Sequence, residues 1–528
     1  MKGKRVTIVV LVLALAASVC AVLGYRTSPR EAITQFEQTD RVARIRPDYS
    51  GAVIPPNIAP LNFSIQEPGA LFCVRISSAQ GDPIEIFSRD PAISIPPGPW
   101  HAMLHRNRGQ EVRFDVFVKH QDSRWRRFQP IANVIAPEDI DGYLVYRKMH
   151  PTHLQVRGEI SIHARDLSTF GKTSLLSGHS LGASTCVNCH SFAQNRPDWL
   201  LLGVRSPDFG VGTLLVSGDT TTRIGAKFGY TSWHPSGRMA VYSVNDLPMF
   251  YHAARNEPRD TVNVDSLLAC YLTETQSIVV EPRLAQKDRL ENWPTWSGDG
   301  KHLYFCSAPK LWSDQRLHPP ERFDQVRYDL MRIAYDVDSQ TWGEMETVVS
   351  SRDTGKSIAM PRCSPDGRWV SFCLFDYGYF PTWHVESDLY MVDLREYDRT
   401  GQAVCRRLEI NSDQSESWHT WSSNSRWLVF SSKRLHSVFT RLWLSYVDAS
   451  GTVHKPIVLP QKDPAYYESC IFSFNTPELV TGLPRVTGEN LARVFRSRRE
   501  LSVKMPITMA TPSAEGTAPG SSWQSRRE

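Results

Sequence analysis

The sequence predicts an all-β protein, a β-propeller preceded by a β-rich N-terminal domain. Two observations lead to this fold class. A short turn motif recurs four times, and each copy is followed by two apolar, strand-like segments. Ahead of the repeats, several segments alternate apolar and polar residues with the period of two that is typical of half-buried strands.

The repeat begins with a small or polar residue and a tryptophan or cysteine, and it continues into a tight turn. The four copies are residues 231–238, 294–301, 361–368 and 419–426. They are spaced by 63, 67 and 58 residues, which corresponds to one blade plus a loop insertion each. Pro-Asp-Gly and its variants supply the turn between two strands. We interpret the repeat residues as structural.

Radial repetition of small antiparallel sheets hides strand edges, which is the physical logic of a propeller. Four blades are too few for the length of the chain. Residues 199–204 with 213–217 are expected to form a further blade, and residues near 466–480 a closing strand or another blade. The sequence therefore predicts a propeller over residues 195–482 with five to seven blades, and six is the expected number.

The N-terminal domain is predicted to span residues 51–185, after a linker over residues 25–50. Its expected strands include residues 71–76, 112–118 and 160–163. One short helix is expected over residues 136–146, because Pro137, Glu138 and Asp139 form a favourable first turn.

The most informative motif is Cys186-Val187-Asn188-Cys189-His190, which has the C-x-x-C-H spacing of c-type haem attachment. Each thiolate can form a thioether bond with one haem vinyl group, and the adjacent imidazole can bind the iron as the proximal ligand. With ten cysteines and sixteen histidines in 528 residues, about 0.006 such matches are expected by chance. The sequence predicts one covalent haem c, held by Cys186, Cys189 and His190 in an attachment loop over residues 186–194.

Three other interpretations compete with haem. A tetrahedral zinc site needs a second close pair of ligands, and the nearest substitutes are His101 with His105 and His150 with His153. A thioredoxin-like C-x-x-C lies between a strand and a helix, whereas the flanks of this motif are typical of loops. A structural disulfide within the motif is the third interpretation.

Residues 1–24 are typical of a signal peptide or a membrane anchor. Lys2, Lys4 and Arg5 precede an apolar run over residues 6–23, whose length lies on the border between a cleavable segment and a spanning helix. Attachment of haem c requires an extracytoplasmic location, so we expect the protein in the periplasm, either soluble or tethered to the membrane. Lipidation at Cys20 is disfavoured, because Val19 is bulky for the position before a lipidated cysteine.

The remaining composition is that of an ordinary folded chain, with 41% hydrophobic residues, 22% charged residues and a net charge of +5. So small a basic excess does not predict a nucleic-acid partner. Residues 483–528 differ, because residues 493–499 form a basic segment in which a helix is expected, and residues 511–528 are rich in Ser, Gly, Pro and Thr. The last segment is predicted to be disordered.

The repeat Trp-Ser-x-Asp-Gly-Lys/Arg resembles the TolB-type, WD-like propeller repeat. Several strings further resemble a bacterial family that joins a TolB-like propeller to one C-x-x-C-H. These strings are residues 54–63, 186–192, 377–384, 417–427 and 459–464. The resemblance covers residues 50–482 and implies the propeller and the haem, but it implies no settled activity.

Three inserts, residues 245–265, 307–327 and 374–387, interrupt the blades between equivalent strands and should gather on one face. They are expected to cap the haem, to bind a partner or to serve as surface decoration. For the distal iron ligand we rank His384 in the third insert first and His419 second. Met149, His150 and His153 are further candidates on the side of the N-terminal domain.

Two classes of function remain open, with a third behind them. The favoured hypothesis is an electron carrier, or an electron-accepting docking module for a redox partner protein. The second is a cell-envelope binding scaffold of TolB type with a structural or regulatory haem. The third is a haem-dependent oxidoreductase with an open distal position.

Overall fold

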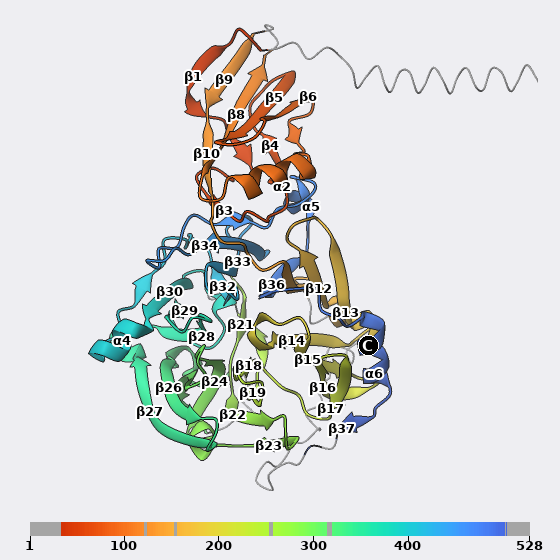
Figure 1. Cartoon of the computed structure of the whole chain (residues 1–528). Helices are drawn as coiled ribbons and strands as arrows, with labels where there is room; N and C mark the ends of the chain where they lie inside the picture. Colours follow the sequence, from red (N-terminus) through yellow and green to blue (C-terminus); the bar gives the residue numbers. More distant parts are fainter. Residues whose placement is uncertain are drawn as a thin grey trace, which may run out of the picture.

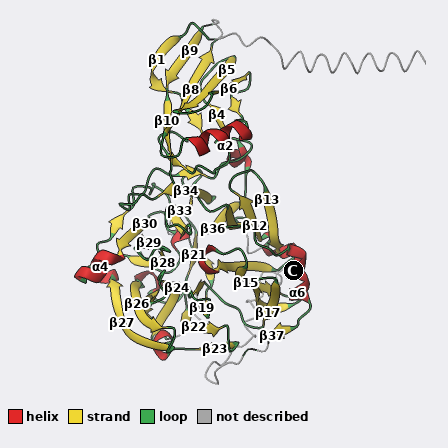
Figure 2. Ribbon diagram, in the orientation of Figure 1, coloured by secondary structure: helices red, strands yellow, loops and turns green. Residues whose placement is uncertain are grey.

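The computed structural model describes residues 33–120, 124–152, 156–252, 257–313, 319–501 and 503, apart from the side chain of Cys189. The described chain is built mostly from strands, with few and short helices (Figure 2), which confirms the all-β fold class. The predicted signal or anchor over residues 1–24 and the predicted disordered tail over residues 511–528 lie outside the described residues. No helix in the described part is both long enough and apolar enough to cross a bilayer.

Six sheets form the larger body of the molecule (Figure 1). Four of them follow one another along the chain. They are β18 (Thr231–Trp233), β19 (Met239–Asp246), β22 (Asp265–Leu272) and β23 (Ser277–Val279); β24 (Arg289–Trp296), β25 (His302–Pro309), β26 (Asp329–Asp336) and β27 (Thr341–Val349); β28 (Ser357–Cys363), β29 (Trp369–Phe375), β30 (Asp388–Asp393) and β31 (Arg406–Arg407); and β32 (Glu416–Trp421), β33 (Trp427–Ser432), β34 (Arg441–Tyr446) and β35 (Ile457–Val458).

The other two sheets combine strands from distant parts of the chain. One contains β14 (Cys186–Phe192), β15 (Trp199–Ser206), β16 (Gly210–Ser217), β17 (Thr220–Ile224) and β37 (Glu500–Leu501); the other contains β13 (Lys172–Ser177), β12 (Ser161–Asp166), β11 (Tyr143–Met149) and β36 (Ser473–Val480). The strands β14, β18, β24, β28, β32 and β36 contact one another in that order, and β36 returns to contact β14. The six sheets therefore form a closed ring around an axis, as in a propeller.

The sheet that closes the ring differs from the sequence prediction. Strands β11 to β13 were expected in the N-terminal domain over residues 51–185, but they form one sheet with β36 from the C-terminal part of the chain, and β11 is the strand that pairs with it. The helix predicted over residues 136–146 is wrong, because β11 occupies its second half and pairs with strands on both sides. Pairing with two neighbours satisfies the backbone of this segment more completely than a short isolated helix can.

The N-terminal module is smaller than predicted and includes part of the expected linker. It has a larger sheet of β1 (Glu37–Val42), β9 (Trp125–Gln129), β8 (Glu111–Lys119), β10 (Ile131–Ile135), β3 (Val53–Ile54), β5 (Leu71–Ser78) and β6 (Ile84–Ser88), and a smaller sheet of β2 (Ile45–Arg46), β4 (Phe63–Ile65) and β7 (Ala92–Ile93). Helix α2 (Pro97–Arg106) completes it. β1 and β2 lie in the stretch 25–50 that was predicted to be a linker, because β1 joins the larger sheet in parallel with β9.

The N-terminal module packs on the sheet of β32 to β35 (Figure 1). Asp141 accepts hydrogen bonds from Ser423, and the Trp427 indole N–H donates to the carbonyl of Asp139 at 3.1 Å. Since β14 belongs to another sheet, the C-x-x-C-H motif does not lie at the junction of the two domains. It lies inside the propeller.

The three inserts meet on one face, as predicted. Phe250, on the hairpin of β20 (Met249–Tyr251) and β21 (Arg259–Thr261), has its ring centroid 5.1 Å from that of Phe323. Phe323 in turn lies 5.9 Å from Tyr377 of the third insert. Each insert therefore contributes an aromatic ring to a shared contact.

Four short helices lie outside the sheets, on the propeller and at its junction with the N-terminal module. They are α3 (Ser351–Thr354), α4 (Leu394–Thr400), α5 (Tyr466–Ser469) and α6 (Gly488–Arg496). Helix α6 overlaps the basic segment for which the sequence suggested a helix. It buries Leu491, Ala492 and Phe495 against the outer strands β13 and β17.

Candidate functional site

The C-x-x-C-H motif lies on β14, the innermost strand of its sheet, and not in the predicted loop over residues 186–194. The polar flanks of the motif suggest a loop, but pairing with the apolar strand β15 overrides this local preference. The register between the two strands shifts between Asn188 and Ser191. Such a shift marks a β-bulge, in which an additional residue redirects the side chains. Cys189 and His190 are the residues inside this bulge.

Equivalent bulges occur in other innermost strands. The registers shift between Asn292 and Thr295 in β24, between Ala359 and Arg362 in β28, and between Ser417 and Thr420 in β32. The first residue inside each of these three bulges has a left-handed backbone, with φ of 53° at Trp293, 55° at Met360 and 50° at Trp418. His190 in β14 and His419 in β32 are both the second residue of their bulges. The fold therefore repeats one backbone position around the axis and fills it with histidine twice.

The two histidines line the same cavity, which has a volume of about 20 Å³ and lies on the propeller axis. The remaining lining residues come from the innermost strands or lie beside them. They are Tyr230, Thr231, Met360, Arg362, Trp418, Thr476, Pro477 and Glu478. The structure thus brings the predicted proximal ligand together with the second-ranked distal candidate.

His190 is buried and uncharged. Its side chain belongs to a residue that is 6% exposed, and burial, with the positive charge of Arg147 nearby, lowers the pKa of His190 to about 3. The carbonyl groups of Val145 and Thr476 lie near the ring and oppose this shift, but neither ring nitrogen has a hydrogen bond of ordinary geometry to any described residue. A neutral imidazole with an available lone pair is the form of histidine that binds metals.

His419 has the same properties. It is 2% exposed, and burial lowers its pKa to about 3. Its Nδ1 lies 3.9 Å from the Sγ of Cys373, whereas its Nε2 has no hydrogen-bond partner in the described chain. The contact of Nδ1 with Cys373 therefore orients the ring, and Nε2 is available to a ligand.

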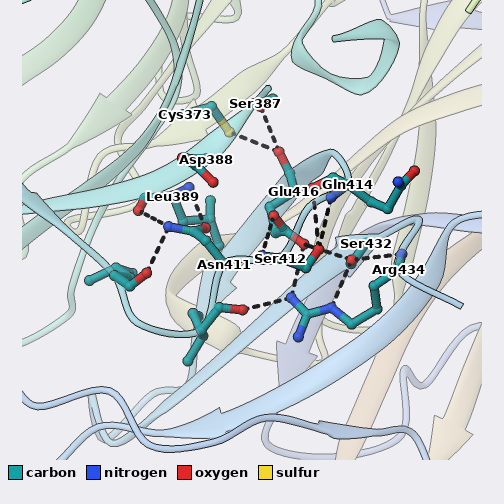
Figure 3. Close-up of polar contacts among 12 residues, drawn as sticks. Cys373, Ser387, Asp388, Leu389, Asn411, Ser412, Gln414, Glu416, Ser432 and Arg434 are labelled. Atoms are coloured by element: carbon teal, nitrogen blue, oxygen red, sulfur yellow. Dashed lines mark hydrogen bonds and ion pairs between the residues drawn. The ribbon is translucent and has the colours of Figure 1, made fainter. Parts of the chain in front are cut away.

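A buried polar network fixes the start of the strand that carries His419 (Figure 3). The carboxylate of Glu416 is fully buried and pairs with Arg434 at 2.9 Å. It also accepts hydrogen bonds from the hydroxyls of Ser412 and Ser432, each at 2.7 Å. The backbone carbonyl of Glu416 accepts a bond from the Cys373 thiol at 3.8 Å, so the network reaches the neighbour of His419. Its charges and hydrogen bonds hold β32 in register.

A wider cavity of about 290 Å³ adjoins the histidines along the axis. It is lined by the residue that follows each bulge and by its counterpart in β18. These residues are Ser191, Ser232, Thr295, Arg362, Thr420 and Glu478. Arg362 and Glu478 line both cavities. Burial raises the pKa of Glu478 to about 7, and the carboxylate accepts a hydrogen bond from the Phe192 backbone N–H at 2.8 Å.

His384, the first-ranked distal candidate, lies elsewhere. It follows the short turn Pro381–Trp383 in the third insert, and it is not among the residues that line either axial cavity. Its Nδ1 lies 3.0 Å from Glu386, and its Nε2 lies 3.9 Å from Asp260. The structure does not bring His384 to His190.

The candidates near the N-terminal domain do not reach the axial cavities either. Met149 is buried, and its sulfur accepts a hydrogen bond from Asn475 at 3.4 Å. His150 pairs with the Thr152 hydroxyl at 2.8 Å. Neither residue lines an axial cavity. His153 lies outside the described residues.

The residues of the axial site fit a haem only in part. The two neutral imidazoles without partners suit an iron with two protein ligands. The two axial cavities share lining residues, and their volumes of about 290 and 20 Å³ together reach only the lower end of the roughly 300–1,000 Å³ of ligand sites, so a haem would require the axis to widen. Cys186 fits less well, because it packs in the apolar core of its own sheet and lines neither cavity. An extended strand separates it from His190 by up to about 13 Å. Attachment through both thiols therefore requires β14 to leave its pairing with β15 at Cys186.

The described side chains contain no group of three or more His, Cys, Asp or Glu residues that could hold a metal ion by themselves. The described cysteines are all free. Cys270, Cys306 and Cys373 are buried, as expected for small apolar residues in strands.

No protein-family model matches the chain, and a search of curated proteins found no match. Among solved structures, the chain is similar to prolyl oligopeptidase B from Galerina marginata, with 10% identity, 65% of this chain and 42% of that chain covered, and a TM-score of 0.34. A putative 6-phosphogluconolactonase from Bacteroides uniformis has 12% identity, coverage of 77% and 99%, and a TM-score of 0.34. A puromycin hydrolase has 12% identity, coverage of 62% and 54%, and a TM-score of 0.35. The chain thus spans less than half the length of the first of these proteins, and the similarities concern the fold alone.

Three residues of the axial site were missed by sequence reasoning, namely Met360, Arg362 and Glu478. The signal was present in the repeat. Arg362 stands directly before Cys363, where the other copies have Ser232, Thr295 and Thr420 before their tryptophans. A charged residue at a position otherwise filled by hydroxyls indicates a role different from blade packing.

Proposed function

We propose that this protein is an exported c-type haem protein that carries electrons. One haem would be attached through Cys186 and Cys189, with His190 and His419 as the axial ligands. The observation that carries the proposal is the shared cavity of two buried, neutral imidazoles whose Nε2 atoms have no partner among the described residues. Leaving such groups buried without partners costs free energy, and a bound metal would offset that cost.

The haem, when bound, supplies reversible one-electron chemistry. The protein contributes position and surroundings. The bulges in β14 and β32 direct His190 and His419 to the axis, and the Glu416 network holds β32. The indole of Trp293 packs 3.7 Å from the ring of Tyr230 and 5.5 Å from that of Trp418. Tyr230 and Trp418 line the smaller axial cavity, so this aromatic packing lies beside the two imidazoles, and a redox partner protein outside the cytoplasm would exchange the electron.

The attachment is tested by producing the full-length protein with a cytochrome maturation system. We expect a haem stain that survives denaturing electrophoresis and one iron per chain. The double variant C186A/C189A should lose the stain, and the control C470A, at a half-buried cysteine away from the motif, should keep it. A stably folded wild-type protein without stain or iron under these conditions would contradict the proposal and favour the cell-envelope scaffold.

The distal ligand is tested by optical spectra of the ferrous protein with and without carbon monoxide. We expect the wild-type spectrum to be low-spin and unchanged by carbon monoxide, because His190 and His419 would both bind the iron. His419→Ala should bind carbon monoxide, whereas the control His384→Ala should behave as the wild type. Ready binding by the wild type would defeat the carrier proposal.

A haem-dependent oxidoreductase is the second candidate, and the axial cavity of about 290 Å³ is the observation that favours it. Such a cavity gives a small substrate room beside the imidazoles. Ready carbon monoxide binding by the wild type would support this candidate.

A further inference from the structure

The wider axial cavity has an unusual ring of side chains. Six strands each contribute one residue, and four of these residues carry hydroxyls, namely Ser191, Ser232, Thr295 and Thr420. The other two are Arg362 and Glu478. At about 30 Å³ per water molecule, the volume of about 290 Å³ holds about ten waters. A ring of donors around such a space is suited to a small polar ligand.

Arg362 is the cation of this ring, and its guanidinium forms no ion pair with a described residue, although the charge of Glu478 acts on it across the ring. None of the described residues accepts a hydrogen bond from its guanidinium or forms an ion pair with it. Other buried arginines of the described chain, such as Arg165, Arg434 and Arg441, donate to carbonyl groups or to a carboxylate. Arg362 is half-buried and its guanidinium has no protein partner, so an anion in the cavity would supply the acceptor that water otherwise supplies.

The neighbouring groups neutralise Arg362 only in part, because the charge of Glu478 acts on it without an ion pair. Glu478 forms no ion pair with it, and its carboxylate is engaged by the Phe192 backbone N–H. Arg147, beyond His190, adds a second positive charge, although it is hydrogen-bonded to Asn188 and Asn475. The potential in the cavity is therefore positive.

Two hydroxyls of the ring are arranged to donate into the cavity. The Oγ of Ser232 accepts the Trp296 backbone N–H at 3.0 Å, and the Oγ1 of Thr295 accepts the Cys363 backbone N–H at 3.4 Å. Because these contacts use oxygen lone pairs, the hydroxyl protons stay available as donors.

We propose that the axial cavity binds a carboxylate or a small oxyanion, held by the fork of the Arg362 guanidinium and by the hydroxyls of Ser232 and Thr295. The site itself does not depend on a haem. The anion is either a free small molecule or, where the proposed haem is bound, a propionate of that haem. Arginine suits both, because its planar fork matches the two oxygens of a carboxylate.

The test uses the full-length protein as purified, and haem content is measured separately by stain and iron analysis. Sodium acetate and sodium nitrite are titrated at constant ionic strength, and binding is followed by calorimetry and by the thermal unfolding midpoint. We expect Arg362→Gln to bind at least tenfold more weakly than the wild type, a loss of about 1.4 kcal/mol. The control Arg395→Gln, at an exposed arginine on α4, should bind as the wild type does.

Two further readouts separate the sources and a merely structural role. In buffer without these anions, Arg362→Gln should unfold at a higher temperature than the wild type, because it removes an unpaired enclosed charge. If a haem propionate is the anion, the haem-loaded wild type should not respond to acetate or nitrite, and Arg362→Gln should change the pH dependence of its reduction potential.

The proposal is overturned if acetate and nitrite bind equally well to the wild type and Arg362→Gln. It is also overturned if neither protein binds them and the variant leaves the pH dependence of the potential unchanged. A lower unfolding temperature of Arg362→Gln in anion-free buffer would assign Arg362 a structural role instead. A failure of the haem proposal is recognised independently, by the absence of the stain.

Discussion

Replacing Glu416 by alanine is expected to destabilise the propeller strongly. The carboxylate is fully buried, and Arg434, which pairs with it at 2.9 Å, is mostly buried as well. Glu416→Ala leaves this guanidinium without its carboxylate and removes the acceptor of the Ser412 and Ser432 hydroxyls (Figure 3). Removing one partner of a buried ion pair costs about 3–5 kcal/mol. With about 2–4 °C per kcal/mol for a body of this size, the thermal midpoint should fall by about 6–20 °C.

The assay is thermal unfolding followed by circular dichroism, with Glu409→Ala as the matched control. Glu409 is exposed on the same connection between sheets, so its replacement should change stability by less than about 0.5 kcal/mol. Glu416→Gln should be intermediate, because the amide oxygen can still accept from the hydroxyls but no longer neutralises Arg434. A midpoint of Glu416→Ala within about 2 °C of the control would refute the reasoning that the network holds β32.

Two other predictions concern pH and the turns between sheets. Burial raises the pKa of Glu291 to about 7, above its value of about 4.3 in an unfolded chain, so the folded state binds this proton more tightly. The stability that this group contributes is fully present below about pH 4 and falls by about 3 kcal/mol toward pH 7. Glu291→Gln should abolish this part of the pH dependence in midpoints measured from pH 4 to 8, and equal slopes of the variant and the wild type would contradict the prediction. A Cβ at Gly298 would lie 2.1 Å from the carbonyl oxygen of Pro365 in the adjacent turn, so Gly298→Ala should cost about 2–3 kcal/mol in chemical denaturation. At Gly367 a Cβ would meet no atom within 4 Å, and only the left-handed φ of 70° opposes it, so Gly367→Ala should cost about 1 kcal/mol. A larger loss of stability for Gly367→Ala than for Gly298→Ala would contradict the packing argument.

The repeated parts of the fold could be predicted from the sequence, because each is a local pattern. The turn motif around Trp233, Trp296 and Trp421 marks the end of an innermost strand in each case. The closing sheet could not be predicted, because its strands come from opposite ends of the ring. Arg147 on β11 and Asn475 on β36 are 328 residues apart and bonded at 2.8 Å. No local periodicity records such a pairing.

The candidate site was predicted in part for the same reason. The motif spacing identifies His190, and the repeat places His419 on an innermost strand. What the sequence did not indicate is the bulge, which depends on how two strands pair and not on the composition of either one. The bulge decides that the residue before Ser191 and the residue before Thr420 face the axis.

His384 shows that a histidine in a loop insert is a weaker candidate for an iron ligand than a histidine on an innermost strand. The sequence predicts that the third insert, which is rich in aromatic residues, places His384 over the cofactor. In the structure, His384 lies between Glu386 and Asp260. What excludes His384 is its place in the fold, because it lines neither axial cavity. His419 has a weakly interacting thiol on one side and no partner within the described chain on the other. In a propeller, the residues that can meet are those at equivalent positions of the innermost strands. A functional side chain therefore reaches the axis wherever one repeat carries a different residue at such a position. His190, His419 and Arg362 are residues of this kind.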